Sequence, residues 1–222
     1  MSVDEPAGLD AHARPGVIWD LGGIIYRYFT EVLLAEAPTR GWALDGIPFG
    51  PTGRLPDPEY ERMSDGHIDE HAYLDIVHAR LATQGIDVHI PSEIDWPRQT
   101  RPEAIRLLAA LQAADHPQAL LTNDATRWLG QRWWETWAPA GYFDAIVDVA
   151  TLGVRKPAPE PYRAGADRLG LQPHECLFVD DMRVNCRGAE AVGMASHHVD
   201  VAAPEHSLAQ LADRLGVELA DV

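Results

Sequence analysis

Short apolar runs alternate with helical patterns along most of the chain. The first run, residues 17–21, contains one acidic residue and is followed by two glycines, which predicts a buried strand that enters a sharp turn. Comparable apolar runs predict further strands at residues 119–121, 145–147, 176–179 and 197–199. Apolar residues at helical spacing predict helices at residues 102–114, 124–137, 159–169 and 184–192. Because strands that alternate with helices form parallel sheets, we predict an α/β fold built on a doubly wound, Rossmann-like parallel sheet.

One interval along the chain breaks this alternation. About 95 residues separate the first two predicted strands, whereas the later crossovers are only about 20 to 30 residues long. Within this interval, residues 31–40 and 68–83 have helical spacing, and residues 46–58 contain three Gly and four Pro, which predicts an irregular loop. We therefore expect a flexible N-terminus at residues 1–15, a helical cap at residues 27–101, and a core formed by residues 16–26 and 102–222.

The composition narrows the class of protein. The chain has 222 residues, of which 46% are hydrophobic, enough for one core that carries a small subdomain. Its 34 acidic and 18 basic residues give a net charge of −16, which repels nucleic acids and anionic membranes. Two cysteines cannot form a multi-bridge framework, no apolar run approaches the roughly 18 residues of a membrane span, and the first residues lack the features of a signal peptide. We therefore expect a cytoplasmic protein that binds neither nucleic acid nor a membrane.

Reactive side chains stand at the ends of the predicted strands. Asp20, Thr122 and the pair Asp180 and Asp181 all occupy such positions. A single acid at a strand end is more often a turn or capping residue, but parallel strands bring their carboxyl ends to one edge, where ligands bind. Carboxylates that lie close together without a cation raise one another's pKa or destabilise the fold. A hard divalent ion such as Mg²⁺ is the natural partner for such a cluster.

Lys156 is the only lysine among the 18 basic residues. A bias towards arginine explains why lysine is missing elsewhere, but it makes the one remaining lysine informative. A compact ammonium group fits between a phosphoryl oxygen and a carboxylate, where the wide guanidinium group does not. We therefore favour a site residue over a surface lysine that precedes a helix.

Four short motifs, in this order, carry a resemblance to a known family. They are Asp20–Gly23 (DLGG), Leu121–Asn123 (LTN), Arg155–Pro157 (RKP) and Phe178–Asn185 (FVDDMRVN). Together, with a helical insertion after the first, they resemble the motifs of the haloacid dehalogenase-like (HAD) hydrolase superfamily. The first motif and the paired aspartates are similar to those of the branch that includes bacterial sugar-1-phosphate phosphatases and the phosphatase domain of epoxide hydrolase. The resemblance implies a Mg²⁺-dependent phosphatase that acts on a small phosphorylated metabolite.

The resemblance also implies a role for each motif residue that contacts the substrate. Asp20 would be the catalytic nucleophile, which attacks phosphorus and becomes an aspartyl phosphate. Thr122 and Asn123 would bind the phosphoryl group. Lys156 would neutralise charge on both the phosphoryl group and Asp20, which allows one anion to approach another.

The remaining motif residues would form the metal site. By the same resemblance, Mg²⁺ would be held by Asp20, Asp181 and the carbonyl oxygen of Gly22. Asp180 would be a further ligand or a hydrogen-bond acceptor behind the ligands, and Asn185 would orient the site.

One position departs from the family pattern. Most phosphatases of the superfamily carry a second Asp two residues after the nucleophile, which protonates the leaving group, whereas this chain has Gly22. Loss of a general acid forfeits roughly 10² to 10⁴ in rate. Two alternatives therefore stay open: a metal-independent 2-haloacid dehalogenase, which has no need for the paired aspartates, and a domain that binds phosphate for regulation without efficient turnover.

Tryptophans are concentrated in one predicted helix. Trp128, Trp133, Trp134 and Trp137 lie within ten residues, which favours helix packing or a contact between subunits over a platform that binds substrate. We therefore include a homo-oligomer among the expected partners.

Overall fold

The computed structural model describes residues 14–90, 93–123, 125–149 and 152–219. Five parallel strands form one sheet in the order β3-β2-β1-β4-β5. The strands are β1 (Gly16–Trp19), β2 (Gln118–Thr122), β3 (Ala145–Asp148), β4 (Cys176–Asp180) and β5 (Ala195–His198). Strand order reverses direction at β1, so the predicted doubly wound sheet is confirmed. Most of the N-terminus that we expected to be flexible lies outside the described residues.

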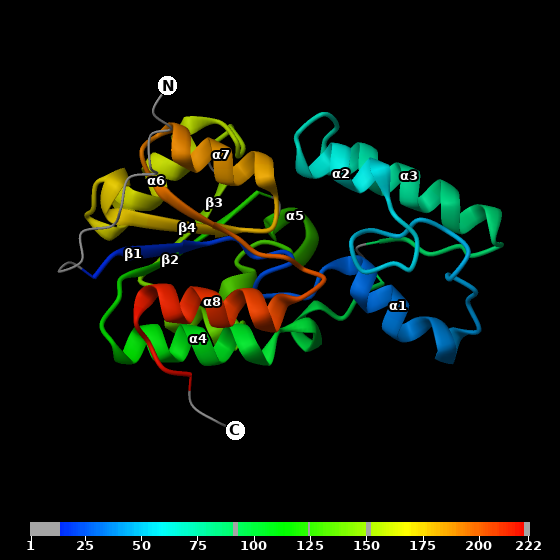
Figure 1. Cartoon of the computed structure of the whole chain (residues 1–222), viewed down its shortest axis with the longest axis horizontal. Helices are drawn as coiled ribbons and strands as arrows, with labels where there is room; N and C mark the ends of the chain where they lie inside the picture. Colours follow the sequence, from blue (N-terminus) through cyan, green and yellow to red (C-terminus); the bar gives the residue numbers. More distant parts are fainter. Residues whose placement is uncertain (1–13, 91–92, 124, 150–151, 220–222) are drawn as a thin grey trace.

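Helices cover both faces of this sheet (Figure 1). They are α4 (Pro102–Ala113) and α8 (Pro204–Leu215) on one face, and α6 (Pro159–Leu169) and α7 (Arg183–Ala191) on the other. Because alternate strand residues point to opposite faces, Val17 and Trp19 of β1 pack in one hydrophobic cluster with residues of α4 and α8. Ile18 packs in the other cluster, with Tyr162 of α6 and Ala189 of α7.

The tryptophan-rich segment is not one helix, so the prediction of a helix at residues 124–137 is wrong. The segment contains α5 (Ala125–Leu129) followed by the 3₁₀ turns η2 (Trp133–Glu135) and η3 (Ala138–Tyr142). Gly130 has a φ of 89°, a conformation that glycine adopts readily and that ends the helix. Trp133 and Trp137 are buried with ring centroids 5.1 Å apart, and Trp137 stacks on Phe143. These two rings pack within the chain, while the side chain of Trp128 lies outside the described residues.

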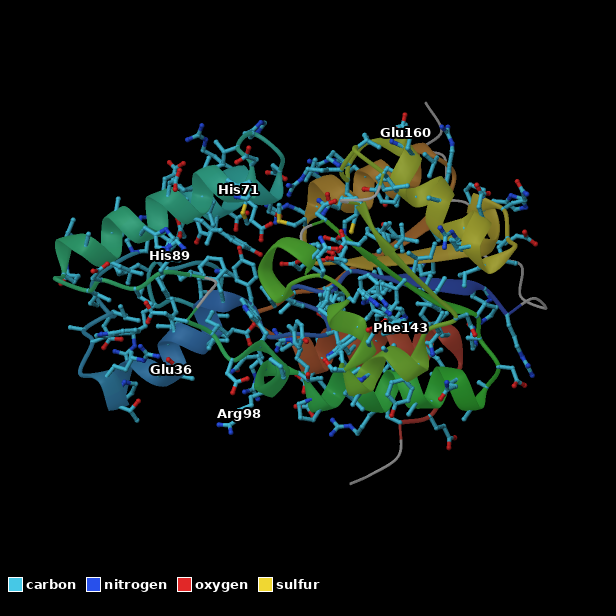
Figure 2. All side chains as sticks on the ribbon, turned by 180° about the vertical axis from the view of Figure 1, so that it is seen from behind. Glu36, His71, His89, Arg98, Phe143 and Glu160 are labelled. Atoms are coloured by element: carbon cyan, nitrogen blue, oxygen red, sulfur yellow. The ribbon has the colours of Figure 1, made fainter. Side chains whose placement is uncertain are left out.

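A set of helices lies between β1 and α4 in the sequence. They are α1 (Phe29–Arg40), α2 (Pro58–Ser64), α3 (Glu70–Thr83) and the 3₁₀ turn η1 (Trp96–Gln99). We call residues 27–101 the insert. Figure 1 shows α1, α2 and α3 gathered beside the sheet rather than on its faces. Seen from behind, Glu36, His71 and His89 lie in the insert, and Phe143 and Glu160 lie in the part that contains the sheet (Figure 2).

The two ends of the insert are tied together where they leave the sheet. Tyr26 and Thr100 form an antiparallel bridge, and the Arg101 amide donates a hydrogen bond to the Ile25 carbonyl oxygen at 2.8 Å. The chain therefore leaves and re-enters the sheet domain through one narrow connection. The hydrophobic pattern of the sequence predicts neither α2 nor α8. Among the described residues, no helix is long and apolar enough to cross a membrane.

Candidate active site

The carboxyl ends of the three central strands bring the motif residues together. Asp20 follows β1 directly, and its amide donates a hydrogen bond to the Val179 carbonyl oxygen at 2.8 Å. Thr122 is the last residue of β2, and Asp180 is the last residue of β4. Parallel pairing of these strands places all three side chains at one edge of the sheet.

Lys156 lies at the centre of this group, and its side chain is only 1% exposed. Its Nζ donates hydrogen bonds to Asp20 Oδ1 at 2.7 Å, Asp180 Oδ2 at 2.9 Å and the Leu121 carbonyl oxygen at 3.0 Å. These contacts use all three hydrogens of the ammonium group. Burial by itself lowers the pKa of Lys156, but the charges of Asp180 and Asp20 outweigh it and hold the pKa above its ordinary value.

Two amide side chains fix the positions of these charged groups. The Asn123 side chain accepts a hydrogen bond from the Lys156 amide at 3.0 Å and donates one to the Lys156 carbonyl oxygen at 3.4 Å. Asn185 donates to both oxygens of Asp180 at 3.1 Å, and the Met182 amide donates to Asp180 Oδ1 at 2.8 Å. The side chain of Asn123 is therefore engaged by the backbone of Lys156, and Asp180 is held from both sides.

Three carboxylates meet beside Lys156. Asp20, Asp180 and Asp181 each offer an oxygen atom within 4.8 Å of the others. Burial raises the pKa of Asp20 to about 6 although the charge of Lys156 opposes the shift. Burial, followed by the charges of Asp180 and Asp20, also raises the pKa of Asp181 well above its ordinary value. Asp181 Oδ2 is buried and has no hydrogen-bond partner. An unpartnered oxygen in a group of hard oxygen donors fits a divalent cation, which would provide the missing partner.

The two glycines after the nucleophile differ in their surroundings. A Cβ on Gly23 would lie 2.8 Å from Asp181 Cγ, and the φ of Gly23 is 70°, so this position requires glycine. A Cβ on Gly22 would meet nothing closer than Asp20 Oδ2 at 4.0 Å. The absence of an acid at residue 22 is therefore not imposed by lack of space.

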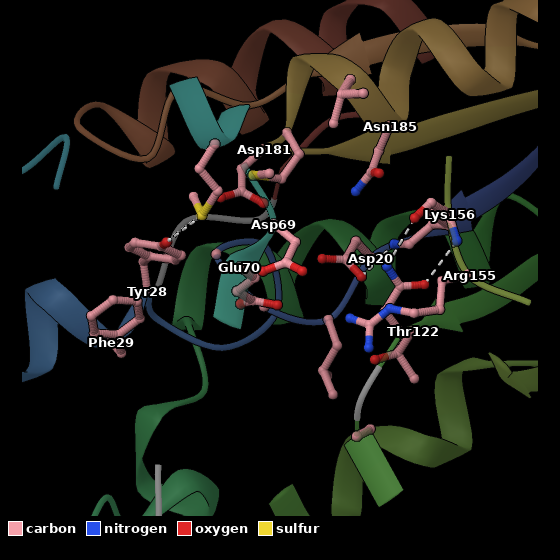
Figure 3. A pocket seen from close by; sticks show the side chains of 18 of the residues that line it. Asp20, Tyr28, Phe29, Asp69, Glu70, Thr122, Arg155, Lys156, Asp181 and Asn185 are labelled. Atoms are coloured by element: carbon pink, nitrogen blue, oxygen red, sulfur yellow. Dashed lines mark hydrogen bonds and ion pairs between the residues drawn. The ribbon is translucent and has the colours of Figure 1, made fainter. Parts of the chain in front are cut away.

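A cavity of about 340 Å³ opens in front of these residues. Asp20, Thr122, Lys156 and Asp181 line it from the sheet (Figure 3). The insert contributes Tyr28, Phe29, Asp69 and Glu70, which lie on the same side of Asp20 as Asp181 in this view, opposite Lys156 and Thr122. The sequence patterns did not mark these insert residues. Asp69 caps α3 by accepting a hydrogen bond from the Ala72 amide at 2.8 Å, so an acid there has an ordinary structural explanation.

Comparison with protein-family models decides the family. The model of the haloacid dehalogenase-like hydrolases matches residues 16–193, most of the chain. The chain belongs to this family of hydrolases. The resemblance of the four motifs is therefore confirmed at the level of the family.

Individual relatives of this HAD hydrolase have different names. Phosphoglycolate phosphatase of Escherichia coli K12 is 34% identical over 95 residues, 43% of this chain and 37% of the relative. A phosphatase structure from Thermococcus onnurineus has a TM-score of 0.56 at 18% identity and covers 93% of this chain and 100% of that chain. L-2-haloacid dehalogenase from Xanthobacter autotrophicus also has a TM-score of 0.56, at 25% identity, covering 83% of this chain and 77% of that chain. The chain spans less than two fifths of the curated relatives that it matches.

Proposed function

We propose that this HAD hydrolase is a Mg²⁺-dependent phosphatase that acts on a small phosphorylated metabolite through an aspartyl phosphate. The observation that carries the proposal is the buried, unpartnered Oδ2 of Asp181, which lies in a group of three carboxylates. A metal-independent reaction at Asp20 gives no reason to bury Asp181 there with an oxygen that has no hydrogen-bond partner. A phosphatase needs a cation to offset the charge of its substrate, and these carboxylates are suited to hold it.

Asp20 is the nucleophile in this proposal. One of its carboxylate oxygens forms a bond to phosphorus as the bond from phosphorus to the leaving oxygen breaks, and water later cleaves the aspartyl phosphate to release inorganic phosphate. Lys156 stabilises the charged form of Asp20 and fixes one of its oxygens at 2.7 Å. Thr122 lines the cavity and would hydrogen-bond a phosphoryl oxygen, and Asn123 would support the same pocket.

The metal would be held by Asp20 and Asp181, together with the carbonyl oxygen of Gly22. Bound Mg²⁺ would neutralise charge on the transferring phosphoryl group. Asp180 differs from Asp181 in its hydrogen bonds, because Lys156, Asn185 and the Met182 amide already donate to the oxygens of Asp180. We assign Asp180 the role of positioning Lys156, and we assign Asn185 the role of positioning Asp180.

Gly22 limits the rate of this reaction. No carboxylate at residue 22 protonates the leaving oxygen or activates water for the second step. Substrates with leaving groups of low pKa should therefore react fastest, and the aspartyl phosphate should accumulate in a burst.

The alternative activity is that of a 2-haloacid dehalogenase. The structural similarity to the Xanthobacter autotrophicus dehalogenase supports this alternative. Both reactions begin with attack by an aspartate, so Asp20 does not distinguish them. Dependence on a divalent cation does. A regulatory domain without turnover is opposed by the intact pair of Asp20 and Lys156.

The test is a panel of phosphate esters assayed for phosphate release with Mg²⁺ and with EDTA, with chloride release from 2-chloropropionate measured in parallel. We expect release of phosphate that requires Mg²⁺ and is abolished in Asp20→Asn. Chloride release that is insensitive to EDTA would instead establish the dehalogenase. Phosphate binding without turnover of any ester would establish the regulatory domain.

A further inference from the structure

We propose that the substrate's leaving group is largely apolar and carries hydrogen-bond donors or a positive charge, and that a negatively charged leaving group is rejected. The inference rests on the proposed phosphatase function and extends it to a class of substrate. It follows from the chemistry of the cavity wall that faces the phosphoryl site.

The insert forms this wall. Tyr28, Phe29, Met63 and Ile68 supply apolar surface, and Asp69 and Glu70 supply carboxylates. Between residues 28 and 70, the described residues that line the cavity include one histidine, His67, and no lysine or arginine. Carboxylates accept hydrogen bonds and attract cations, so this wall is complementary to hydroxyl or ammonium groups on an apolar body.

The described lysine and arginine residues that line the cavity are Lys156, Arg155 and, within the insert, Arg27. Lys156 has all three hydrogens engaged by Asp20, Asp180 and a carbonyl oxygen. Arg155 lies next to Thr122 at the phosphoryl end (Figure 3), where a phosphoryl dianion would take its charge. Arg27 and Arg155 are both exposed to solvent, where one ion pair contributes little. A carboxylate on the leaving group would therefore face Asp69 and Glu70 without a buried partner.

The size of the cavity agrees with this inference. A volume of about 340 Å³ lies at the lower end of the range for sites that enclose drug-sized ligands. A two-carbon acid would leave most of this volume unfilled and its carboxylate near two others. The name of the Escherichia coli relative, phosphoglycolate phosphatase, thus describes a substrate that we expect this chain to reject.

Three phenyl phosphates test the proposal at nearly constant leaving-group chemistry. Their para substituents are methyl (neutral), aminoethyl (positive) and carboxymethyl (negative). One methylene group separates the carboxylate from the ring and two separate the ammonium group from it, so the phenols have similar pKa values. We expect kcat/KM in Mg²⁺ to follow the order positive, neutral, negative, with at least about a ten-fold difference between the two charged esters.

The double variant Asp69→Asn and Glu70→Gln should remove most of this preference. Asn is as good a helix N-cap as Asp, so α3 should keep its start. We expect the ratio of kcat/KM for the positive and negative esters to fall about ten-fold. Asp75→Asn is the matched control, because Asp75 is exposed on the same helix and does not line the cavity. Its ratio should equal that of the wild type.

Binding of the same esters to Asp20→Asn, measured by calorimetry, separates this inference from the proposed function. Release of phosphate from none of the esters by the wild type would refute the phosphatase, while the order of binding affinities would still decide the charge preference. Equal or tighter binding of the negative ester, or an unchanged charge ratio in the double variant, would overturn the inference. Turnover of all three esters without a charge preference would overturn it and leave the phosphatase standing.

Discussion

Replacement of Lys156 by arginine keeps the positive charge but cannot keep the contacts. The ammonium nitrogen lies 2.7 Å from Asp20 Oδ1, 2.9 Å from Asp180 Oδ2 and 3.0 Å from the Leu121 carbonyl oxygen. It also lies 5.1 Å from the centre of the Phe178 ring, in a position where the side chain is almost fully buried. A guanidinium group is planar and wider, so it cannot occupy this space and satisfy acceptors in three directions.

These contacts bound the loss in the free energy of unfolding that replacement of Lys156 causes. Removal of one partner from a buried ion pair costs about 3 to 5 kcal/mol, which we expect for Lys156→Met. Arginine retains the charge but overpacks a filled core, which costs about 1 to 3 kcal/mol in the free energy of unfolding. Because the nucleophile is displaced, kcat/KM of Lys156→Arg should fall about 100-fold or more.

Urea unfolding followed by tryptophan fluorescence gives the stability change, and hydrolysis of para-nitrophenyl phosphate in Mg²⁺ gives the kinetics. Arg155→Lys is the control, because it exchanges the same two residue types at the neighbouring position, which is exposed. We expect it to change the free energy of unfolding by less than about 1 kcal/mol. Wild-type stability together with wild-type kcat/KM in Lys156→Arg would refute the reasoning, since the site would then accept any cation.

Three further predictions concern the acid, the metal and the insert. Gly22→Asp should raise kcat/KM for alkyl phosphates more than for aryl phosphates, because space exists for a proton donor; an equal change for both classes would contradict this role. Without metal, the free energy of unfolding should fall by up to about 3 kcal/mol as the pH rises from about 4 to about 6, because folded Asp20, with its pKa raised from 3.8 to about 6, keeps a proton that the unfolded chain releases. Mg²⁺ should therefore raise Tm more at neutral pH than at pH 5. Calorimetry that shows no such difference would be contrary evidence. Arg183 contacts Asp65 of the insert at 3.0 Å, so Arg183→Gln should loosen the insert and raise its rate of proteolysis, whereas unchanged cleavage would show that this ion pair does not hold it.

The strands of the sheet follow largely from local pattern. Val17, Ile18 and Trp19 form a run that is apolar on both faces, which only a strand covered by helices on both sides can bury. Parallel strands then place Asp20 and Asp180 at the same edge, so the meeting of the motif residues could be predicted from their order. The break at Gly130 could not, because the apolar spacing continues past the residue whose backbone conformation ends the helix.

Sequence alone determined that this chain forms a doubly wound sheet with aspartates, a threonine and a single lysine at its carboxyl edge. The tertiary structure decided what each of these groups contacts. Lys156 lies 136 residues from Asp20 in the chain, and Arg183 lies 118 residues from Asp65, so neither pair leaves a local signal. The carboxylates of Asp69 and Glu70 are likewise ordinary helix-start residues until folding places them in the cavity. Periodicity records which face of an element is buried, whereas the partner across a site depends on contacts between distant segments that only the folded chain brings together.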